Sequence, residues 1–372
     1  MEKIGFGVVG CGFFGGEFAR ILQEMEEAKV TAVLGGSGPS AREVAEQVGC
    51  ELEEGLEKLV SRSDVHAVVV ASPNHRHKEA VLAAAHHGKH VFCEKPAALS
   101  LEDAREMVLA CREAKVQLMV GHILHFFRGI EQVKSWIRSG AIGRPLVCHA
   151  ERTGWEQKQE GVSWKKRQDE AGGHLFHHIH ELDLVVALMG TVSSVGMMAG
   201  NLAHTGEGFG DEDDVLLVSL SFAGGGFGTL QYGSGFQWGE HYIKINGSEG
   251  AIKIDFRNSV VEWRAGGVTQ AVIGLHGDPD EDAERVRLYR MLDGGVIYGD
   301  PQKRPPAFLR TPMRREMQAF CRAIQGKPMQ EDKKLLFDGT AALRSVAAAS
   351  AALQARDRQQ IVRLDSVLKD LP

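Results

Sequence analysis

The sequence lacks four features that would place the protein in a specialised class. It contains no apolar run of the ~18 residues that a membrane-spanning helix needs. Its six cysteines include no C-x-x-C pair, which argues against a zinc site or a disulfide framework. The net charge of -6 and the pI near 6.3 exclude the basic face of a typical nucleic-acid-binding protein. The opening Met1-Glu2-Lys3 runs straight into an apolar segment and leaves no room for a signal peptide. We therefore expect a cytoplasmic protein without a nucleic-acid or membrane partner.

The first third of the chain alternates short apolar runs with helical stretches. At ~150 residues per domain, 372 residues predict two domains or slightly more. Strand–helix alternation gives right-handed β-α-β units and a doubly wound parallel sheet. We predict such an α/β domain over residues 1–123, with strands at Ile4–Gly10, Lys29–Leu34, Val65–Ala71, His90–Cys93 and Val116–Val120.

The remainder has a different texture. Apolar and polar residues alternate between glycines, a pattern typical of antiparallel strands with one covered face. The clearest segments are Val215–Phe222, Phe227–Tyr232, His241–Ile245 and Ala251–Phe256. We predict an α+β domain over residues 124–372 with a large, open, mostly antiparallel sheet. It should contain one helical insert at Leu175–Met189, a long loop with one short helix over residues 265–310, and helices at Thr311–Ile324 and Leu335–Gln354.

A glycine loop follows the first predicted strand. Gly10-Cys11-Gly12-Phe13-Phe14-Gly15 matches G-x-G-x-x-G and is followed by a predicted helix from Glu17. In this context Gly10 allows the tight turn, Gly12 lets the backbone approach a pyrophosphate, and Gly15 lets helix and strand pack closely. The pyrophosphate would lie at the helix N-terminus. The pattern predicts a dinucleotide site, although a purely structural glycine turn would look the same.

The second strand is not followed by the carboxylate that usually binds the ribose 2′-hydroxyl of NAD. The chain there reads Leu34-Gly35-Gly36-Ser37-Gly38-Pro39-Ser40-Ala41-Arg42. One interpretation is an unusual loop that binds NAD through its backbone. The other is a loop with room for a 2′-phosphate, with Ser37, Ser40 and Arg42 as donors. The hypothesis adopted here is an NAD(P) cofactor with a preference for NADP(H).

Two further motifs turn this pattern into a resemblance. Ala71-Ser72-Pro73-Asn74-His75-Arg76-His77 follows the third main strand, and Cys93-Glu94-Lys95-Pro96 follows the next. Together with the glycine loop, these motifs resemble those of the Gfo/Idh/MocA oxidoreductases, which include glucose–fructose oxidoreductase, inositol dehydrogenase and their relatives. The resemblance covers nearly the whole chain and includes two later motifs, Gly140-Ala141-Ile142-Gly143 and Gly172-Gly173…His180-Glu181-Leu182-Asp183.

The resemblance implies a Rossmann domain, a sheet domain that commonly forms dimers or tetramers, and a last helical segment that packs back on the first domain. It implies a carbohydrate substrate, with Lys95 steadying the alkoxide and His180 acting as the base in hydride transfer. A lysine ammonium is a compact donor, and imidazole titrates near working pH. With the glycine loop it implies a cofactor set of Gly10, Gly12, Phe13, Phe14, Gly15, Ser37, Ser72, Asn74, His77, Glu94 and Lys95.

One position departs from the family pattern. Inositol-dehydrogenase-like members have an aspartate four residues before the catalytic histidine, whereas this chain has Phe176. Around it stand His174, His177 and His178, and helical spacing would place these three on one face with Glu181, opposite His180. A metal site is conceivable there, but the helix should begin only after Gly173 and the family is not metal-dependent. We predict no metal.

We expect His174, His177 and His178 to bind substrate hydroxyls. Trp164, with Trp155, could stack on a sugar ring or simply anchor its loop. His122 and His125 could join the pocket or be structural.

Three functions fit these observations. The first is an NAD(P)-dependent dehydrogenase or reductase of a sugar, polyol or sugar derivative. The second is a redox-assisted glycosidase or epimerase, in which a retained cofactor is reduced and reoxidised in each cycle. The third is a non-catalytic nucleotide sensor, which the presence of both Lys95 and His180 disfavours. All three share the same expected fold and assembly, a homodimer or homotetramer.

Overall fold

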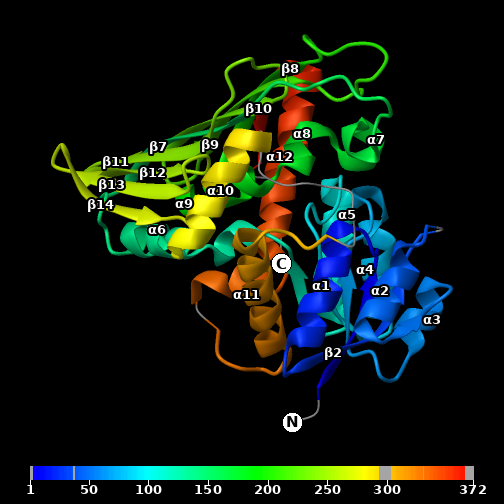
Figure 1. Cartoon of the computed structure of the whole chain (residues 1–372). Coiled ribbons are helices and arrows are strands. Elements are labelled where there is room, and N and C mark those ends of the chain that lie inside the picture. The colour runs from blue at the N-terminus through cyan, green and yellow to red at the C-terminus, as the bar shows by residue number, and fades with distance from the viewer. Residues whose placement is uncertain (1–2, 37, 293–302, 330, 365–372) are drawn as a thin grey trace. The chain divides into compact units, whose positions relative to one another are not determined.

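The computed structural model describes residues 3–36, 38–292, 303–329 and 331–364. The chain forms two compact units, which are considered separately (Figure 1). Unit 1 contains the residues up to Ile123 and the described part of Val296–Leu343. Unit 2 contains Leu124–Gly295 and the described residues from Arg344 onward. In the described part of the chain, no helix is both long and apolar enough to cross a membrane.

Unit 1 is built on a six-stranded parallel sheet of order β3-β2-β1-β4-β5-β6. All residues of β1 and β4 are buried because helices cover both faces, as in other parallel sheets. The order reverses between β1 and β4, and the glycine loop follows β1 at this switch point. The strands are β1 (Ile4–Val9), β2 (Ala28–Leu34), β3 (Glu51–Leu52), β4 (Ala67–Val70), β5 (His90–Cys93) and β6 (Leu118–Val120).

The helices of unit 1 connect these strands. They are α1 (Phe13–Glu24), α2 (Ser40–Val48), α3 (Leu56–Ser61), η1 (Asn74–Arg76), α4 (His77–His86), α5 (Leu101–Glu113), α11 (Ala307–Ile324) and η4 (Glu331–Leu336). Although distant in sequence, α11 packs against α1, and Phe320 contacts the rings of Phe6 and Phe92. The predicted Rossmann-type sheet is confirmed. The sequence pattern did not reveal short elements such as β3, whose residues are exposed. It also placed the start of α11 one turn too late, at Thr311 beside Pro312.

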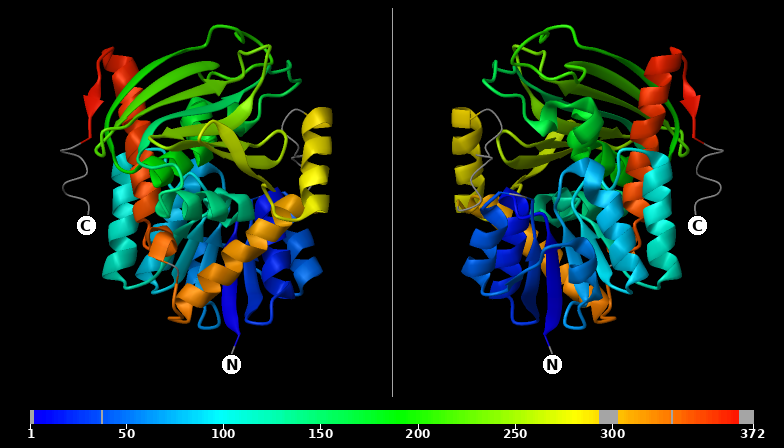
Figure 2. Two further views of the ribbon diagram at one scale, coloured as in Figure 1. Left: turned by 90° about the vertical axis from the view of Figure 1, so that its left-hand side faces the viewer. Right: turned by 90° about the vertical axis from the view of Figure 1, so that its right-hand side faces the viewer.

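Unit 2 is built on a nine-stranded sheet of order β14-β13-β12-β11-β7-β10-β9-β8-β15 (Figure 2). Only the β7–β10 pair is parallel, so the expected mostly antiparallel sheet is confirmed. The strands are β7 (Pro145–Thr153), β8 (Val192–Gly200), β9 (Val215–Phe222), β10 (Phe227–Gly233), β11 (His241–Gly247), β12 (Gly250–Asp255), β13 (Val260–Ala265), β14 (Val268–Gly274) and β15 (Val362–Arg363).

Helices cover one face of this sheet: α6 packs on β13 and β14, α8 on β10, and α9 on β7. The alternation predicted from the sequence follows from this one-sided cover, since Leu216, Val218 and Leu220 are buried on the covered face. The helices of unit 2 are η2 (Ile123–Phe126), α6 (Arg128–Arg138), η3 (Trp164–Lys166), α7 (Gln168–Ala171), α8 (Gly173–His177), α9 (His180–Met189), α10 (Pro279–Leu292) and most of α12 (Thr340–Arg358).

Two expectations for this region need correction. The long loop with one short helix expected over residues 265–310 also contains strand β14, and its helix, α10, is fourteen residues long. Strand β14 is exposed at the edge of the sheet and α10 is rich in charge, so neither shows the apolar periodicity on which the prediction relied. The predicted helix at Leu335–Gln354 is a 3₁₀ turn followed by α12, which begins at Thr340.

The helical insert at Leu175–Met189 was also predicted wrongly, as one helix. The chain forms α8 and α9 with a break at His178 and Ile179, so a single helical phase does not relate the histidines of this segment. The helix was expected to begin only after Gly173, whereas α8 already includes Gly173 and His174. The break reorients the residues that follow, and His180 becomes the first residue of α9.

Candidate active site

The glycine loop of unit 1 has the backbone shape that a pyrophosphate site requires. Gly10 has a φ of +94°, and a Cβ there would meet the backbone of Ala71. A Cβ on Gly15 would lie 1.8 Å from the Gly10 carbonyl oxygen, so this position must be glycine for helix and strand to pack. A Cβ on Gly12, in contrast, would meet nothing within 4 Å. Packing therefore does not explain Gly12, and open space lies in front of its backbone where a ligand could approach.

The N-terminus of α1 suits an anion. The helix starts at Phe13, directly after Gly12, and its first turn carries no acidic side chain. The N-cap residue Gly12 makes no side-chain cap, and N–H groups at a helix N-terminus together with the helix dipole favour a bound phosphate. Phe13 and Phe14 contact each other edge to face at 5.3 Å, close to this N-terminus. The residues present therefore fit the phosphates of a dinucleotide.

The loops that follow β4 and β5 are joined by one buried histidine. His77 Nδ1 lies 2.8 Å from the Pro96 carbonyl oxygen, and Nε2 lies 2.8 Å from that of Ser72. The side chain is fully buried, and burial lowers the pKa of His77. Asn74 is buried beside it on η1. The structure thus places His77 behind the two motif loops, where it fixes their spacing.

The Glu94-Lys95-Pro96 motif contains an unusual carboxyl group. Glu94 accepts a hydrogen bond from the Lys95 backbone N–H (3.1 Å), and burial raises the pKa of Glu94 to about 7 in spite of the Lys95 charge. Glu94 is half-buried, whereas Glu316 of α11 is fully buried, and burial together with the charge of Glu94 raises the pKa of Glu316 well above its ordinary value. Two neighbouring carboxyl groups removed from water cannot both ionise readily. No sequence pattern indicated this pair, because its members are 222 residues apart.

The loop between β2 and α2 is the segment that would contact the ribose of a dinucleotide. Ser37 lies outside the described residues. Ser40 and Arg42 stand in the first turn of α2 and, with Ser40 half-buried and Arg42 exposed, both are accessible. No carboxylate occupies the described residues between Leu34 and Arg42.

Unit 2 contains a cavity of about 430 Å³ at the covered face of its sheet. Its wall is rich in cations and imidazoles and includes an indole ring. The lining residues used below are Arg152, Trp155, Lys158, Lys166, His174, His178, Ser234, His241, Arg257 and Tyr289. Of the four predicted substrate-binding residues, the cavity wall contains His174 and His178. Trp164 and His177 are not among its lining residues, and their rings contact each other edge to face at 6.4 Å.

His174 belongs to a buried polar network at this cavity. Its Nε2 lies 3.2 Å from Ser234 Oγ and 3.3 Å from Glu212 Oε1, and its ring stacks on His178. Burial and the nearby Lys166 lower the pKa of His174 to about 3, so the imidazole is neutral. Burial raises the pKa of Glu212 to about 7, although Lys166 Nζ lies 3.0 Å from this carboxyl. The cavity wall thus holds a neutral imidazole beside a carboxyl group that titrates near neutrality.

A second buried network connects three elements. Arg152 of β7 donates to Glu181 Oε1 (3.1 Å), and His241 of β11 lies 2.7 Å from the same oxygen. Burial alone would raise the pKa of Glu181, but Arg152 and His241 hold it well below its ordinary value. Glu181 was considered in the sequence only as a possible metal ligand. The residues that surround it, Arg152 and His241, had no local signal beyond being polar positions at strand ends.

The remaining predicted residues fall in separate places. His180 is half-buried at the N-terminus of α9. His125 Nε2 lies 2.7 Å from Asp183 Oδ2, and Lys134 Nζ lies 2.6 Å from His125 Nδ1, which makes His125 a structural tie for α9. His122 is buried in unit 1. Phe176, which replaces the expected aspartate, is fully buried. Among the described residues no group of three or more histidine, cysteine or carboxylate side chains is arranged to hold a metal ion.

The family model for the Gfo/Idh/MocA oxidoreductase family, NAD-binding Rossmann fold, matches residues 4–122. The model for the C-terminal alpha/beta domain of the same family matches residues 134–364. The chain therefore belongs to the Gfo/Idh/MocA oxidoreductases, enzymes that act on CH–OH groups with a nicotinamide dinucleotide, and the expected NAD-binding Rossmann domain is confirmed.

Two relatives with nearly the same length are close in sequence. A 2,7-anhydro-N-acetylneuraminate hydratase from Mediterraneibacter gnavus is 43% identical over 371 residues, covering 99% of this chain and 98% of the relative. The enzyme of that name from Escherichia coli is 43% identical over 369 residues, covering 98% of each chain. Among solved structures, levoglucosan dehydrogenase in complex with NADH and levoglucosan has a TM-score of 0.77 at 19% identity and covers 98% of this chain and 100% of its own. That structural likeness shows the fold alone.

Proposed function

We propose that this enzyme adds water to a 2,7-anhydro sialic acid, releasing N-acetylneuraminate, with a nicotinamide cofactor that is reduced and reoxidised within each cycle. The observation that carries the proposal is the cation-lined cavity of unit 2. Arg152, Lys158, Lys166 and Arg257 stand around it against the carboxylates of Glu156 and Glu240, and this excess of positive charge suits a sugar that bears a carboxylate rather than a neutral polyol. The relatives that share 43% of the sequence carry the matching name.

The reaction explains why a hydratase has an oxidoreductase fold. In a 2,7-anhydro sialic acid, C2 bears the ketal oxygen O7, and C3 lies between C2 and the C4 hydroxyl. Oxidation of that hydroxyl to a ketone makes the C3 hydrogens acidic and places the C2–O7 bond β to the carbonyl. O7 can then leave, water can add to C2, and the ketone can be reduced again. A bound nicotinamide supplies reversible hydride acceptance, and no net oxidation results.

Lys95 and His180 have the roles that the family resemblance implies. We assign to the Lys95 ammonium the stabilisation of the developing alkoxide, and to the His180 imidazole the removal of the hydroxyl proton. His174 and His178, on the cavity wall, would bind hydroxyl groups of the sugar. Trp155 lines the same cavity and offers a face for the ring or the acetamido group. His177 and Trp164 would support this wall from behind.

The test uses the purified protein, 2,7-anhydro-N-acetylneuraminate and a cofactor at a small fraction of the substrate concentration. N-acetylneuraminate should accumulate in large molar excess over the cofactor, without net growth of the reduced-nicotinamide absorbance. One reduced cofactor per substrate would instead establish a net dehydrogenase, and absence of product with either cofactor would refute the proposal. His180→Ala should lower kcat, whereas His174→Ala should mainly raise KM. Dialysis against a chelator should change neither.

The cofactor choice is part of the proposal. The loop after β2 carries no carboxylate in its described part, and Arg42 stands accessible on α2, which supports room for a 2′-phosphate and hence NADP(H). Binding of NAD and NADP to the free protein, measured by calorimetry, decides between them. Much tighter binding of NAD would exclude the NADP proposal and leave the hydratase proposal intact.

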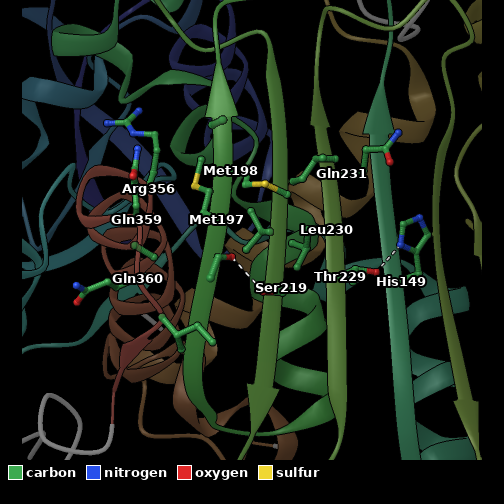
Figure 3. A pocket seen from close by; sticks show the side chains of 16 residues that line it. His149, Met197, Met198, Ser219, Thr229, Leu230, Gln231, Arg356, Gln359 and Gln360 are labelled. Carbon is green, nitrogen blue, oxygen red and sulfur yellow. Dashed lines mark hydrogen bonds between the residues drawn. The ribbon is translucent and has the colours of Figure 1, made fainter.

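We further propose that the protein is a homodimer or homotetramer. The uncovered face of the nine-stranded sheet carries the exposed apolar side chains Val147, Met198, Leu217 and Phe227. A hollow of about 870 Å³ lies on this face, bordered by β7, β8, β9, β10 and the end of α12 (Figure 3). Exposed apolar side chains gathered on one face of a sheet suit an interaction site. Light scattering on the wild type and on Phe227→Asp should give an oligomer and a smaller species, respectively.

A further inference from the structure

A chain of three side chains in unit 2 is not used by the roles assigned above. Glu181 of α9, His241 at the start of β11 and Tyr289 of α10 are joined in a line. His241 Nε2 lies 2.7 Å from Glu181 Oε1, and His241 Nδ1 is hydrogen-bonded to the Tyr289 hydroxyl. Glu181 and His241 are buried, and Tyr289 is 8% exposed on the wall of the 430 Å³ cavity. The line therefore begins in the core and ends at the candidate substrate site.

The hydrogen bonds fix the direction in which this line can move a proton. Glu181 is ionised, since Arg152 and His241 hold its pKa low in spite of burial, and a carboxylate can only accept. His241 must then carry its proton on Nε2 and present a lone pair at Nδ1. Burial lowers the pKa of His241 to about 4, so the imidazole is neutral. It follows that the Tyr289 hydroxyl donates to His241 Nδ1 and presents its oxygen lone pairs for other contacts.

Arg285 places one positive charge beside Tyr289. Arg285, one helical turn before Tyr289 on α10, lies with its guanidinium 5.1 Å from the centre of the Tyr289 ring and interacts with its hydroxyl. Arg285 is itself buried and held by a hydrogen bond to the Phe256 carbonyl (2.9 Å). At the other end of the line, Arg152 of β7 donates to the same Glu181 oxygen that His241 contacts. The line is therefore held in place by a cation at each end.

We propose that Tyr289 is the acid–base residue for the elimination and water-addition steps, with His241 and Glu181 as the positioning residues behind it. This assignment rests on the proposed hydratase function and separates those steps from hydride transfer at Lys95 and His180. The arrangement has the logic of a nucleophile–imidazole–carboxylate triad, in which the imidazole takes a proton only while the outer group receives one.

Protons and electrons balance in both the elimination and the water addition. In the elimination, the Tyr289 oxygen takes a proton from C3 of the keto sugar while its own proton passes to His241 Nδ1. The C3–H electron pair forms the C2=C3 double bond, the C2–O7 bond breaks, and the proton returns through Tyr289 to O7. In the addition, Tyr289 takes a proton from water as the C2–O bond forms, and the proton returns to C3. Each half starts and ends with a neutral imidazole and a phenol, so no external proton is consumed.

A purely structural role of Tyr289, His241 and Glu181 would give different results in experiments. The same bonds could simply hold α10 against β11, in which case loss of the hydroxyl would lower stability and affect all chemical steps alike. The proposal instead predicts that the oxidation step survives. Tyr289→Phe removes one oxygen atom, and Tyr242→Phe is a matched control, since Tyr242 follows His241 on β11 and contacts His149 beside the uncovered face.

The experiment mixes each protein with 2,7-anhydro-N-acetylneuraminate and one equivalent of cofactor in D₂O. The wild type and Tyr242→Phe should form N-acetylneuraminate carrying deuterium at C3. Tyr289→Phe should form reduced cofactor at a near-normal rate and hold it, while N-acetylneuraminate formation falls at least ~10²-fold and C3 gains no deuterium. Product formation by Tyr289→Phe within a few-fold of the wild type would overturn the assignment, and so would loss of cofactor reduction in that variant. A wild type that makes no product would overturn the hydratase proposal and this assignment together.

Discussion

Carboxyl groups buried in the two units have opposite ionisation behaviour. In unit 1, burial raises the pKa values of the half-buried Glu94 and the fully buried Glu316, and the charge of Glu94 raises that of Glu316 further. In unit 2, Glu181 is as deeply buried as Glu316, yet Arg152 and His241 hold its pKa well below the ordinary value. Removal from water disfavours the charged form in all three cases, and only the neighbours differ. The comparison teaches that cations and donors contributed by other strands, rather than depth, decide whether a buried carboxyl group is charged.

The two units also differ in the chemistry that their charged groups can support. The motif loops of unit 1 place the Lys95 ammonium next to Glu94, a carboxyl group that burial makes readily neutral. The cavity of unit 2 combines four cations and two carboxylates in its wall with neutral imidazoles, and the ionised Glu181 lies behind His241. The first arrangement suits stabilisation of a developing negative charge, and the second suits anion binding and proton relay.

The largest effect is expected for Lys95→Met. It removes the cation assigned to the developing alkoxide and should lower turnover by at least ~10²-fold, while cofactor affinity stays within a few-fold of the wild type. Steady-state kinetics and calorimetric titration with the cofactor measure the two quantities. Lys58→Met, at an exposed lysine on α3, is the matched control and should behave as the wild type. Near-normal turnover of Lys95→Met would remove this lysine from the mechanism.

Replacing each buried carboxyl by an amide tests the comparison directly. Glu181→Gln removes the anion that compensates Arg152 and His241, and should lower the free energy of unfolding by about 3 kcal/mol. Glu316→Gln replaces a group that is already neutral, and should change it by less than about 1 kcal/mol near neutral pH. Urea denaturation measures both. Equal losses in the two variants would contradict the opposite ionisation states assigned to these residues.

The pH dependence of stability should show the unit 1 pair. Above the ordinary glutamate pKa of 4.5, the unfolded chain ionises Glu94 and Glu316 while the folded chain keeps them protonated. Their contribution therefore makes the free energy of unfolding fall as pH rises from 4.5 toward the Glu94 value of about 7. Glu316→Gln should flatten this fall, whereas the surface variant Glu46→Gln should not. Identical pH profiles for wild type and Glu316→Gln would disprove the raised pKa.

The smallest effect concerns the ribose loop. Gly36→Asp should disfavour NADP relative to NAD by about tenfold in affinity, through repulsion of a 2′-phosphate. Gly36 is the suitable position because a Cβ there meets nothing within 4 Å, whereas a Cβ on Gly35 would lie 2.5 Å from that of Ala41. Gly36→Asn is the uncharged control. An unchanged ratio of NADP to NAD affinity in Gly36→Asp would show that the 2′ position lies elsewhere.

The two units also differ in how much of them could be predicted. The strands of the unit 1 sheet and its glycine loop could be predicted from the spacing of apolar residues and glycines. Each helix and strand there is one continuous segment, and its buried residues recur at one regular spacing. Strand β9 was predicted with its bounds, Val215–Phe222, for the same reason. The prediction for residues 265–292 missed β14 and the length of α10. Helix α10 is stabilised by a few tertiary contacts, such as those of Arg285 and Tyr289, rather than by an apolar face that the sequence would reveal.

The sequence by itself determined the Rossmann-type unit, the glycine loop, the two motif loops and the one-sided sheet, because these depend on spacing within short segments. Only the tertiary structure decided which polar side chains act together. Arg152, Glu181, His241 and Tyr289 come from four elements that the sheet of unit 2 and its covering helices bring together, and Glu94 meets Glu316 through the packing of α11. Ionisation depends on distances of a few ångströms between such groups, and no local pattern encodes distances between segments that are far apart in the chain.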